Sequence, residues 1–539
     1  MRKSLVLRYV PLAVLLIIGF FCSSQASKYI SSWRRHRIYS VALRQAINNE
    51  SFTKEQNCKA YFELLASSLK EDSLLRDVGA KKAWIRTFVE NIRAYGACFV
   101  MGDTDVDEET VASIERKLFP FFTGEDPVVT KWDGKIVKPT EREQKSFWGH
   151  RRASCSGKGI AISMSDRGVE EAKALLRVLR YLENELPIEF VHRGDLSSVS
   201  IDALVSVARS DLGFESTENY ICPPQEIYFV DASRAINQDM ANLFYRFANK
   251  WVATLFSSFD EMILMDTDVV PFLKPIKMFD YDSYKKHGAL FFRDRFTKER
   301  TWTTPMGFFR SLFASPEECR AFELQDYRQL AENTGFFKSK SKHVMESGMV
   351  VMKRSTHLSG LLLSTAMQFW HETSGPFYGD KELFWLGQAY AGEASFSFNE
   401  KNAAAIGELE KRGSTISVCS AQPAQFDDGL QLLWLNGGLR KCKKGFFKQD
   451  FKALSSLRTK YKTPEELHAY YRSPVTINGA VIPSHKENFV QDRSKGCIGY
   501  IWCASIKNGD AEGSLIEFSD EKVEFIKRVV DIWYGDVKN

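Results

Sequence analysis

The feature that most constrains this fold is the stretch EMILMDTDVVPF at residues 261–272, where an apolar run ends in two carboxylates. Asp266 and Asp268 are one residue apart, and side chains at positions i and i+2 of an extended chain lie on the same side. Two carboxylates this close repel unless a cation lies beside them. Oxygen ligands of this kind suit Mg²⁺ or Mn²⁺ better than Zn²⁺. The pattern therefore predicts a divalent-metal site that would hold a diphosphate.

Strand and helix patterns alternate around this stretch. Strands are expected at 157–163, 188–194, 225–232 and 287–295, and helices at 169–186 and, as one long element, at 239–258. Such alternation predicts an α/β sheet with parallel strands. In sheets of this class the ligand lies beyond the carboxyl ends of the strands, which is where Asp266 and Asp268 are placed.

The regions on either side have a different character. Apolar residues recur at helical spacing within 58–78, 81–100 and 102–122, so residues 27–150 are expected to form a stem and a helical subdomain. Residues 151–450 are expected to form the α/β domain. Residues 451–539 would be a C-terminal extension packed on that domain, ending in a capped helix.

The N-terminus carries a targeting signal. A basic tail at 1–8 precedes an apolar run at 9–22, which small residues extend to 26. We predict a cytosolic tail at 1–8 and a transmembrane signal-anchor at 9–26. The alternative is a cleaved signal peptide, because Ser24-Gln25-Ala26 resembles a cleavage site. Either interpretation sends the rest of the chain into the secretory lumen, where Asn49, in the sequon Asn49-Glu50-Ser51, would be an N-glycosylation site.

Charge and cysteine usage argue against nucleic-acid binding and against a zinc site. The net charge is +5 and no block of Lys and Arg is present, so a nucleic-acid-binding role is not expected. Of the ten cysteines, Cys22 lies in the apolar N-terminal run and the other nine are scattered without a CxxC pair, which disfavours a zinc site. Some of the nine are expected to form disulfides, with at least one left free or intermolecular.

Two acidic residues elsewhere are candidate catalytic groups. Glu346 lies in HVMESGMVVMKR, a polar entry into an apolar strand, where it could meet a sugar hydroxyl. Asp380 lies in YGDKELFWLG, a tight turn that leads into a helix. The structural alternatives are an ordinary strand start for Glu346 and a helix-dipole interaction for Asp380.

Four further residues are candidates for binding. Lys250 and Arg246 lie in the expected long helix before the strand and could contact the diphosphate, or they could be solvated helix charges. His485 in IPSHKENF could be a third metal ligand, although a lone histidine is more often structural or merely exposed. Asn436 in LWLNGGLRKC is a weaker candidate.

One rival enzyme class shares the first motif. An apolar strand followed by Asp-x-Asp-x-Val is also how haloacid-dehalogenase-type phosphatases begin, with the first Asp as nucleophile. Their later acidic motif needs Gly-Asp followed by a second Asp, whereas Gly379-Asp380 continues with Lys-Glu-Leu-Phe. Several strand and helix units also precede the motif here, which disfavours this class.

Several motifs in order make the chain resemble the fungal Golgi alpha-1,3-mannosyltransferases, glycosyltransferase family 71. They are GKGIAIS at 157–163, FANKWVATLFSSFDEMILMDTDVVPF at 247–272, HVMESGMVVMKR at 343–354, YGDKELFWLG at 378–387 and LWLNGGLRKCK at 433–443. The resemblance implies a GT-A fold and a Golgi type II membrane protein with a luminal catalytic domain. It also implies GDP-mannose as donor, Mn²⁺ as cofactor and transfer with retention to a terminal mannose of N- or O-linked mannan glycans on glycoproteins. A homo- or hetero-oligomer with other mannosyltransferases is compatible with it.

On this resemblance, Asp266 and Asp268 would hold Mn²⁺ on the GDP diphosphate. Asp380 would orient the donor mannose or stabilise its cationic centre, and Glu346 would position donor or acceptor. The non-enzyme alternative is a catalytically silent scaffold subunit of a mannosyltransferase complex. The intact Asp266-Thr267-Asp268 motif argues against that alternative, because a silent subunit has no need of it.

Overall fold

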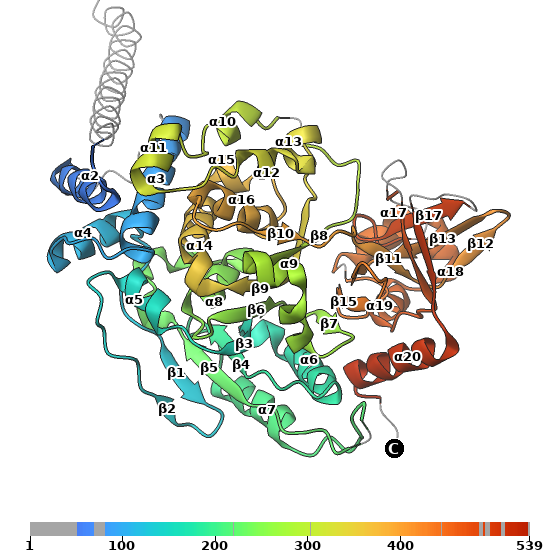
Figure 1. The fold of residues 1–539 in the computed structure, drawn as a ribbon. Helices are drawn as coiled ribbons and strands as arrows, with labels where there is room; N and C mark the ends of the chain where they lie inside the picture. Colours follow the sequence, from blue (N-terminus) through green and yellow to red (C-terminus); the bar gives the residue numbers. More distant parts are fainter. Residues whose placement is uncertain are drawn as a thin grey trace, which may run out of the picture.

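A mixed α/β architecture surrounds one large central sheet in this computed structural model, which describes residues 51–68, 81–218, 220–301, 303–443, 445–483, 489–490, 496–507 and 513–536 (Figure 1). The sheet has nine strands in the order β10-β8-β9-β6-β3-β4-β5-β1-β2. Their bounds are β1 (Val128–Lys131), β2 (Ile136–Val137), β3 (Lys158–Ser163), β4 (Ile188–His192), β5 (Ile227–Asp231), β6 (Glu261–Met265), β8 (Ala289–Arg293), β9 (Met345–Lys353) and β10 (Ser397–Phe398).

The centre of this sheet is parallel, as the alternating pattern predicts. β3 pairs in parallel with both β4 and β6, and β4 pairs in parallel with β5. The strand order reverses between β3 and β6, so the crevice expected in such sheets lies at the carboxyl end of these two strands. β9 runs antiparallel to β6 and to β8, so β8 has the same direction as β6.

Two hydrophobic cores lie on opposite faces of the sheet. Ala161 and Leu264 face a core built with α3 (Lys81–Tyr95), α8 (Asn249–Phe256), α14 (Arg354–Gln368) and α16 (Lys381–Ala391). Ile162 and Ile263 face a core built with α6 (Val169–Tyr181), α7 (Ser198–Arg209) and α20 (Asp520–Tyr534). Alternate residues of one strand therefore belong to different cores, as burial on both faces of a parallel sheet requires.

The prediction of one long helix over 239–258 is wrong. The segment forms two 3₁₀ turns, η4 (Gln238–Leu243) and η5 (Arg246–Ala248), before the true helix α8 begins at Asn249. Arg246 has φ of +54°, a left-handed conformation that ends any continuous helix. The break turns Phe247 to the surface and leaves Lys250 in the first turn of α8.

The N-terminal helices confirm most of the predicted pattern. α2 (Lys54–Ser68), α3 and α4 (Glu108–Leu118) are helical, and α4 begins where the Asp107 side chain accepts the Thr110 backbone N–H at 2.9 Å. β1 and β2 lie within the same region, however, and extend the central sheet beyond β5. The predicted boundary at residue 150 therefore divides one continuous sheet.

A second, antiparallel region contains the C-terminal part of the chain. A six-stranded sheet has the order β18-β16-β11-β14-β15-β7 and a three-stranded sheet has the order β12-β13-β17. The bounds are β7 (Val269–Pro271), β11 (Ala404–Gly407), β12 (Glu410–Arg412), β13 (Thr415–Ser420), β14 (Pro423–Phe426), β15 (Leu432–Asn436), β16 (Gly479–Ile482), β17 (Trp502–Lys507) and β18 (Ser514–Glu517). β16 pairs with β11 and β17 with β13, so the predicted boundary at 450 also crosses continuous sheets.

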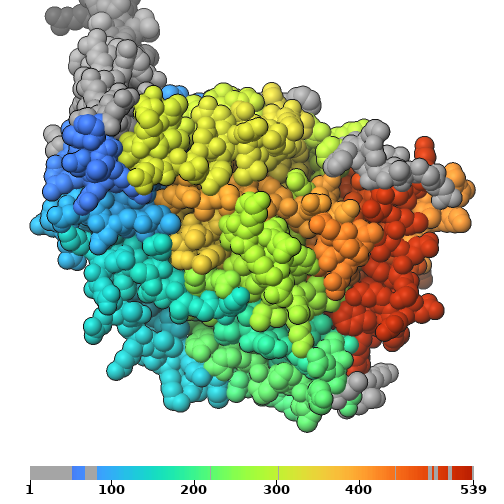
Figure 2. All heavy atoms as spheres, in the orientation of Figure 1, coloured from blue at the N-terminus to red at the C-terminus, as the bar shows by residue number. Residues whose placement is uncertain are grey.

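The short helices connect these layers or cover the C-terminal sheets. They are α5 (Phe147–Ser154), α9 (Asp282–His287), α10 (Met306–Arg310), α11 (Pro316–Phe322), α12 (Arg328–Glu332), α13 (Gly335–Ser339), α15 (His371–Ser374), α17 (Phe447–Ala453), α18 (Ser455–Lys460) and α19 (Pro464–Arg472). Figure 2 shows the C-terminal segment in red along one side of the molecule, against the orange segment, with the blue N-terminal helices on the opposite side.

Three disulfides confirm the expectation that some cysteines pair: Cys58–Cys98, Cys419–Cys503 and Cys442–Cys497. Cys155, Cys222 and Cys319 are free. The predicted anchor at 9–26 and the sequon at Asn49 lie outside the described residues. Within the ranges given above, no helix is both long and apolar enough to cross a membrane.

Candidate active site

Three strand ends meet at one edge of the central sheet. Asp266 directly follows β6, and Asp294 directly follows β8, which has the same direction as β6. The antiparallel β9 begins at this edge, because Met349 pairs with Met265 and Met345 with Arg293. Residues far apart in the sequence, at 266, 294 and 346, are therefore brought to one edge by strand direction alone.

Lys250 lies at the centre of the acidic cluster at this edge. Its Nζ is 2.9 Å from Asp266 Oδ2 and 3.3 Å from Asp380 Oδ2, and it donates to the Ser347 carbonyl oxygen at 3.0 Å. The Lys250 and Asp380 side chains are 9% and 3% exposed. Burial would lower the pKa of Lys250, but the two carboxylates raise it above its ordinary value. Lys250 is thus the internal counter-charge of two aspartates, and its pairs direct it toward them.

Asp266 has two negatively charged neighbours, Asp268 and Asp380, but only one ion pair, with Lys250. Burial raises the pKa of Asp266 to about 7, and Asp268 and Asp380 act in the same direction against the lowering effect of Lys250. Its backbone N–H donates to the Gly348 carbonyl oxygen at 2.8 Å, which ties the start of the turn to β9. The site therefore has an excess of negative charge that a cation would relieve.

Asp268 is held by the C-terminal region. The backbone N–H groups of Gly437 and Gly438 donate to the Asp268 carbonyl oxygen at 3.0 and 2.9 Å. Both glycines have positive φ, +117° and +67°, so the turn needs residues without a side chain there. Lys443 Nζ lies 3.4 Å from Asp268 Oδ2. The segment 436–443 therefore completes the site from a second sheet.

Glu346 is fixed within the same cluster. Its Oε1 accepts the Gly348 backbone N–H at 3.0 Å and the Asn436 side-chain amide at 2.9 Å. A Cβ at Gly348 would lie 2.9 Å from Asn436 Nδ2 and 3.0 Å from the Trp434 ring, so a larger residue would have to displace these side chains. Glu346 and Asn436 thus link β9 to β15 across the crevice, and this contact is the position the structure gives to the weaker candidate Asn436.

A charged network holds the residues on either side of Gly379 and Asp380 in the chain. Asp294 Oδ2 is 2.5 Å from Lys381 Nζ and 2.9 Å from His343 Nδ1, and the Asp294 side chain is 1% exposed. Burial would raise the pKa of Asp294, but Lys381 and His343 hold it well below its usual value. Glu299 Oε2 accepts from the Tyr378 hydroxyl at 3.1 Å and lies 3.2 Å from His343 Nε2. Tyr378 and Lys381, which flank Gly379 and Asp380 in the chain, are therefore held by this network, while Asp380 itself pairs with Lys250.

The structure brings together Asp266, Asp268, Asp380, Glu346 and Lys250 of the predicted site residues. Arg246 is exposed and its guanidinium lies 5.1 Å from the centroid of the Tyr245 ring, so no described contact links it to the aspartates. His485, the predicted third metal ligand, lies outside the described residues. Asp294 and Lys443 are absent from the prediction. Asp294 lies at the end of the strand expected at 287–295 and directly follows the observed β8, so the rule applied to Asp266 would have found it.

The oxygen donors fit the expected divalent metal. Asp266, Asp268, Asp380 and Glu346 are four carboxylates, and Lys250 and Lys443 are the two ammonium groups that lie among them. Carboxylate oxygens are the ligands that Mg²⁺ and Mn²⁺ prefer. Over the described part of the chain, no three His, Cys, Asp or Glu side chains are already grouped as a metal site.

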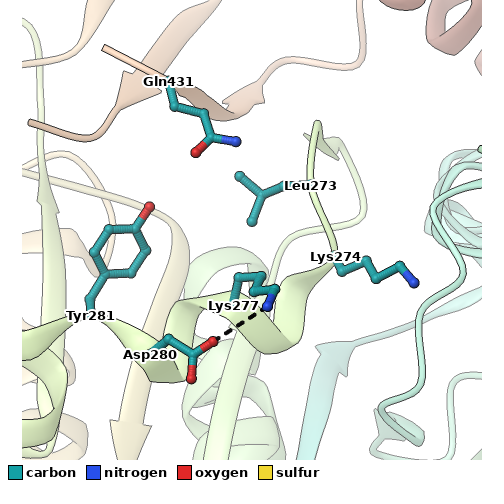
Figure 3. A pocket seen from close by; sticks show the side chains of 6 residues that line it. All are labelled: Leu273, Lys274, Lys277, Asp280, Tyr281 and Gln431. Carbon is teal, nitrogen blue, oxygen red and sulfur yellow. Dashed lines mark ion pairs between the residues drawn. The ribbon is translucent and has the colours of Figure 1, made fainter. Parts of the chain in front are cut away.

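A separate open cavity of about 410 Å³ lies beside η6 (Pro275–Asp280), away from this cluster (Figure 3). Its charged groups are paired with one another or with neighbours: Lys277 with Asp280 at 3.8 Å, and Lys274 with Glu183 and Glu218 at 3.1 Å. The cavity is lined by Leu273, Lys274, Lys277, Asp280, Tyr281 and Gln431. None of the predicted site residues is among them.

Comparison with known proteins agrees with the motifs. A family model described as "Mannosyltransferase putative" matches residues 157–427. The chain is 31% identical over 477 residues to alpha-1,3-mannosyltransferase MNT2 of Saccharomyces cerevisiae, covering 80% of this chain and 83% of that protein. It is 28% identical over 553 residues to alpha-1,3-mannosyltransferase MNT3 of the same yeast, covering 92% and 85%. The solved structure of the yeast mannosyltransferase Ktr4p, at 11% identity, covers 58% of this chain and 83% of that one with a TM-score of 0.28, a likeness too slight to inform the fold.

Proposed function

Because the chain belongs to the fungal alpha-1,3-mannosyltransferase family, glycosyltransferase family 71, we propose that it transfers mannose from GDP-mannose to a terminal mannose of N- or O-linked mannan glycans. The chain is a glycosyltransferase by the same relationship.

The observation that carries the proposal is the carboxylate cluster at the carboxyl end of β6. It lies where strand order reverses in a parallel sheet, the usual place for a nucleotide ligand. Such a sheet, with Asp266 and Asp268 at the end of β6, supports a GT-A assignment. Mn²⁺ would be held by Asp266 and Asp268 and, when bound, supplies positive charge that neutralises the departing diphosphate.

The residues of the chain have distinct roles in this reaction. The bond between mannose C1 and the phosphate oxygen breaks, and a bond forms from C1 to the 3-hydroxyl oxygen of the acceptor on the same face. The acceptor hydroxyl proton passes to the departing phosphate oxygen. Asp380, buried and paired with Lys250, orients the donor mannose and stabilises positive charge at C1. Glu346, held by Asn436 and Gly348, positions a sugar hydroxyl.

A Golgi location with a luminal catalytic domain is part of the proposal. Three disulfides support it, because disulfides persist in the oxidising secretory pathway and are rare in the cytosol. The basic and apolar N-terminal segment and the sequon at Asn49 are consistent with a type II signal-anchor. Immunofluorescence of the full chain with a Golgi marker, and protease protection of its C-terminus, would test both points.

The two alternatives differ in what they require of the site. A phosphatase of the haloacid-dehalogenase type would need a second aspartate after Asp380, where Lys381 instead pairs with Asp294. A silent scaffold would not need two carboxylates paired with one buried lysine, or two further carboxylates beside them. Membership of a glycosyltransferase family favours neither alternative.

The test is sugar transfer by the detergent-solubilised full chain. GDP-mannose and, separately, UDP-sugars would be offered to an alpha-linked mannobiose with Mn²⁺ or with EDTA. Asp266→Asn and Asp268→Asn are expected to lower kcat/KM by at least 100-fold, because each removes a charge that holds the diphosphate. Asp280→Asn, which changes an exposed aspartate at the separate cavity, is the matched control and should leave transfer unchanged.

Mannose transfer that needs Mn²⁺ and is lost in both variants, with an alpha-linked product, would establish the donor, the metal and retention. Transfer that persists in EDTA and in both variants would remove the metal from the proposal. No transfer from any donor, together with no Mn²⁺-dependent shift of thermal unfolding by GDP, would favour the scaffold.

A further inference from the structure

Two exposed aromatic rings flank the turn that carries Asp380. Phe247 and Tyr378 are each 54% exposed, although most aromatic side chains of the described residues are buried. They come from segments 131 residues apart, by the difference of their numbers, and meet at Gly379. Large exposed rings next to a cluster of charged side chains are typical of ligand-binding surfaces.

The contact between the two segments is direct. A Cβ added at Gly379 would lie 2.9 Å from the Phe247 ring, so this ring covers the glycine. Gly379 has φ of +73°, which also favours glycine. Phe247 belongs to η5, directly before the helix that carries Lys250, and Tyr378 directly precedes Gly379 and Asp380. The two rings are therefore fixed to the same turns that hold the Lys250–Asp380 pair.

Tyr378 is held rigidly from one side. Its ring stacks on His343, with centroids 5.2 Å apart and planes 27° apart, and its hydroxyl donates to Glu299 Oε2 at 3.1 Å. An exposed ring with both its plane and its hydroxyl fixed is preorganised, which lowers the entropy lost on binding. The cost of exposing two such rings to water is explained if they form a binding surface.

We propose that Phe247 and Tyr378 form the acceptor subsite, a platform on which the non-reducing mannose of the acceptor glycan stacks. This inference rests on the proposed function. The C–H groups on one face of a pyranose ring carry partial positive charge and pack against the negative face of an aromatic ring. The acceptor must reach C1 of the mannose that Asp380 orients; the Phe247 ring lies against Gly379, which directly precedes Asp380, and Tyr378 directly precedes Gly379. The charged diphosphate, by contrast, belongs with Asp266 and Asp268.

The test separates acceptor binding from donor binding and from chemistry. Phe247→Leu and Tyr378→Leu remove a ring but keep apolar volume against the turn. Each is expected to raise the KM for alpha-linked mannobiose five- to twenty-fold, while the KM for GDP-mannose and its slow hydrolysis without acceptor stay within two-fold of wild type. Tyr378→Phe keeps the ring but removes the hydroxyl bond to Glu299, so it should raise the acceptor KM less than Tyr378→Leu does, which separates stacking from that bond.

Matched controls exist elsewhere on the surface. Phe52→Leu and Tyr220→Leu change exposed rings outside the turns at 245–250 and 377–380 and should leave both KM values unchanged. A rise in the GDP-mannose KM rather than the acceptor KM would show that the rings bind the nucleotide and would overturn the proposal. Unchanged acceptor KM in both leucine variants would also overturn it.

Direct binding distinguishes failure of the platform from failure of the proposed function. Saturation-transfer NMR of mannobiose with the full chain needs no turnover. Signal with the wild type that is lost in both leucine variants would support the platform even if GDP-mannose were not the donor. No signal with the wild type would overturn it.

Discussion

Lys250 determines the charge balance of the crevice. It is the buried cation between Asp266 and Asp380, so removing it leaves two carboxylates without their partner. Breaking a buried ion pair from one side costs about 3–5 kcal/mol, because the remaining charge is unpaired in a poorly solvated site. Because Lys250 is already paired with these two carboxylates, the prediction that it contacts the diphosphate is tested separately from its role in the charge balance.

We expect Lys250→Met to lower the free energy of unfolding by about 3–5 kcal/mol in EDTA. Mn²⁺ should restore part of this loss, because a divalent cation can replace the missing charge beside the carboxylates. Urea unfolding of both proteins with EDTA and with Mn²⁺ would measure this. Lys277→Met, at a lysine whose side chain is 63% exposed, is the control and should change stability by less than 1 kcal/mol. A loss no larger than that of the control would contradict the role given to Lys250.

Glu393 is a buried carboxyl group of a different kind. Neither of its side-chain oxygens has a hydrogen-bond partner among the described residues, and its Oε1 would lie 2.9 Å from a Cβ placed on Gly96. Burial raises the pKa of Glu393 to about 7, whereas the group ionises near pH 4.3 in the unfolded chain. The folded state therefore favours the protonated carboxyl.

The raised pKa of Glu393 makes the stability of the protein fall as the pH rises. A raised carboxyl pKa contributes stability below about pH 4, and this contribution is lost as the pH rises to about 7, in total about 3–4 kcal/mol. Glu393→Gln should remove this dependence. At pH 5 the free energy of unfolding of the variant should equal that of the wild type or be slightly lower, and at pH 8 it should be higher. Urea unfolding across this range would measure it, with Glu63→Gln on the exposed side of α2 as control. If the difference in free energy of unfolding between wild type and variant does not change with pH, the burial of Glu393 is contradicted.

α20 packs against the turn that holds Asp268. Trp533 is 4% exposed, and its ring lies 3.4 Å from a Cβ placed on Gly438, the residue that with Gly437 binds the Asp268 carbonyl oxygen. Arg177 of α6 donates to the carbonyl oxygens of Ile532 and Trp533 at 3.1 and 2.9 Å, which fixes the end of α20 against the central domain. The last helix of the chain therefore supports the turn that holds one of the two aspartates.

We expect Trp533→Ala to lower stability by about 3–5 kcal/mol and to raise the Mn²⁺ concentration needed for half-maximal transfer several-fold, because the 437–438 turn loses its support. Trp148→Ala is the matched control: Trp148 is 1% exposed and its ring packs against the rings of Phe119, Phe122 and Phe256. It should cost similar stability without changing the Mn²⁺ requirement. Equal changes of that requirement in both variants would indicate general loosening rather than support of Asp268.

Local pattern predicted the strands and their direction well. β3, β4, β5, β6 and β8 lie within or next to the predicted segments, because apolar runs bounded by turn residues carry a local signal. The helix expected at 239–258 failed because hydrophobic periodicity does not report a left-handed residue such as Arg246. The Asp294–Lys381 pair joins residues 87 positions apart, and nothing local in either segment encodes that contact.

Strand pairing across the predicted domain boundaries concerns the whole molecule. β1 and β16–β18 complete sheets begun elsewhere in the chain, so strand pairing crosses residues 150 and 450. Composition changes at those points, but pairing partners are not visible in composition. The C-terminal segment is consequently part of the site: β15 pairs with β7, the strand that follows Asp268, and Lys443 reaches Asp268 itself.

The disulfides allow this connection to be tested. Cys442–Cys497 closes a separation of 55 residues beside Lys443, and Cys58–Cys98 closes one of 40 residues among the N-terminal helices. Loop-closure entropy predicts a loss of about 4 kcal/mol for either pair when it is removed. We therefore expect the double variants Cys442→Ser/Cys497→Ser and Cys58→Ser/Cys98→Ser to lose similar free energy of unfolding.

Their effects on activity should differ, because only the first pair anchors the segment that reaches Asp268. Removing Cys442–Cys497 should raise the KM for GDP-mannose several-fold at a temperature where both proteins remain folded, and removing Cys58–Cys98 should leave it unchanged. Thermal unfolding and initial rates measured on the same samples would decide. If both pairs change the KM equally, the 436–443 segment has no special part in holding the donor; if neither does, Asp268 is positioned by the Gly437–Gly438 turn without help from the disulfide.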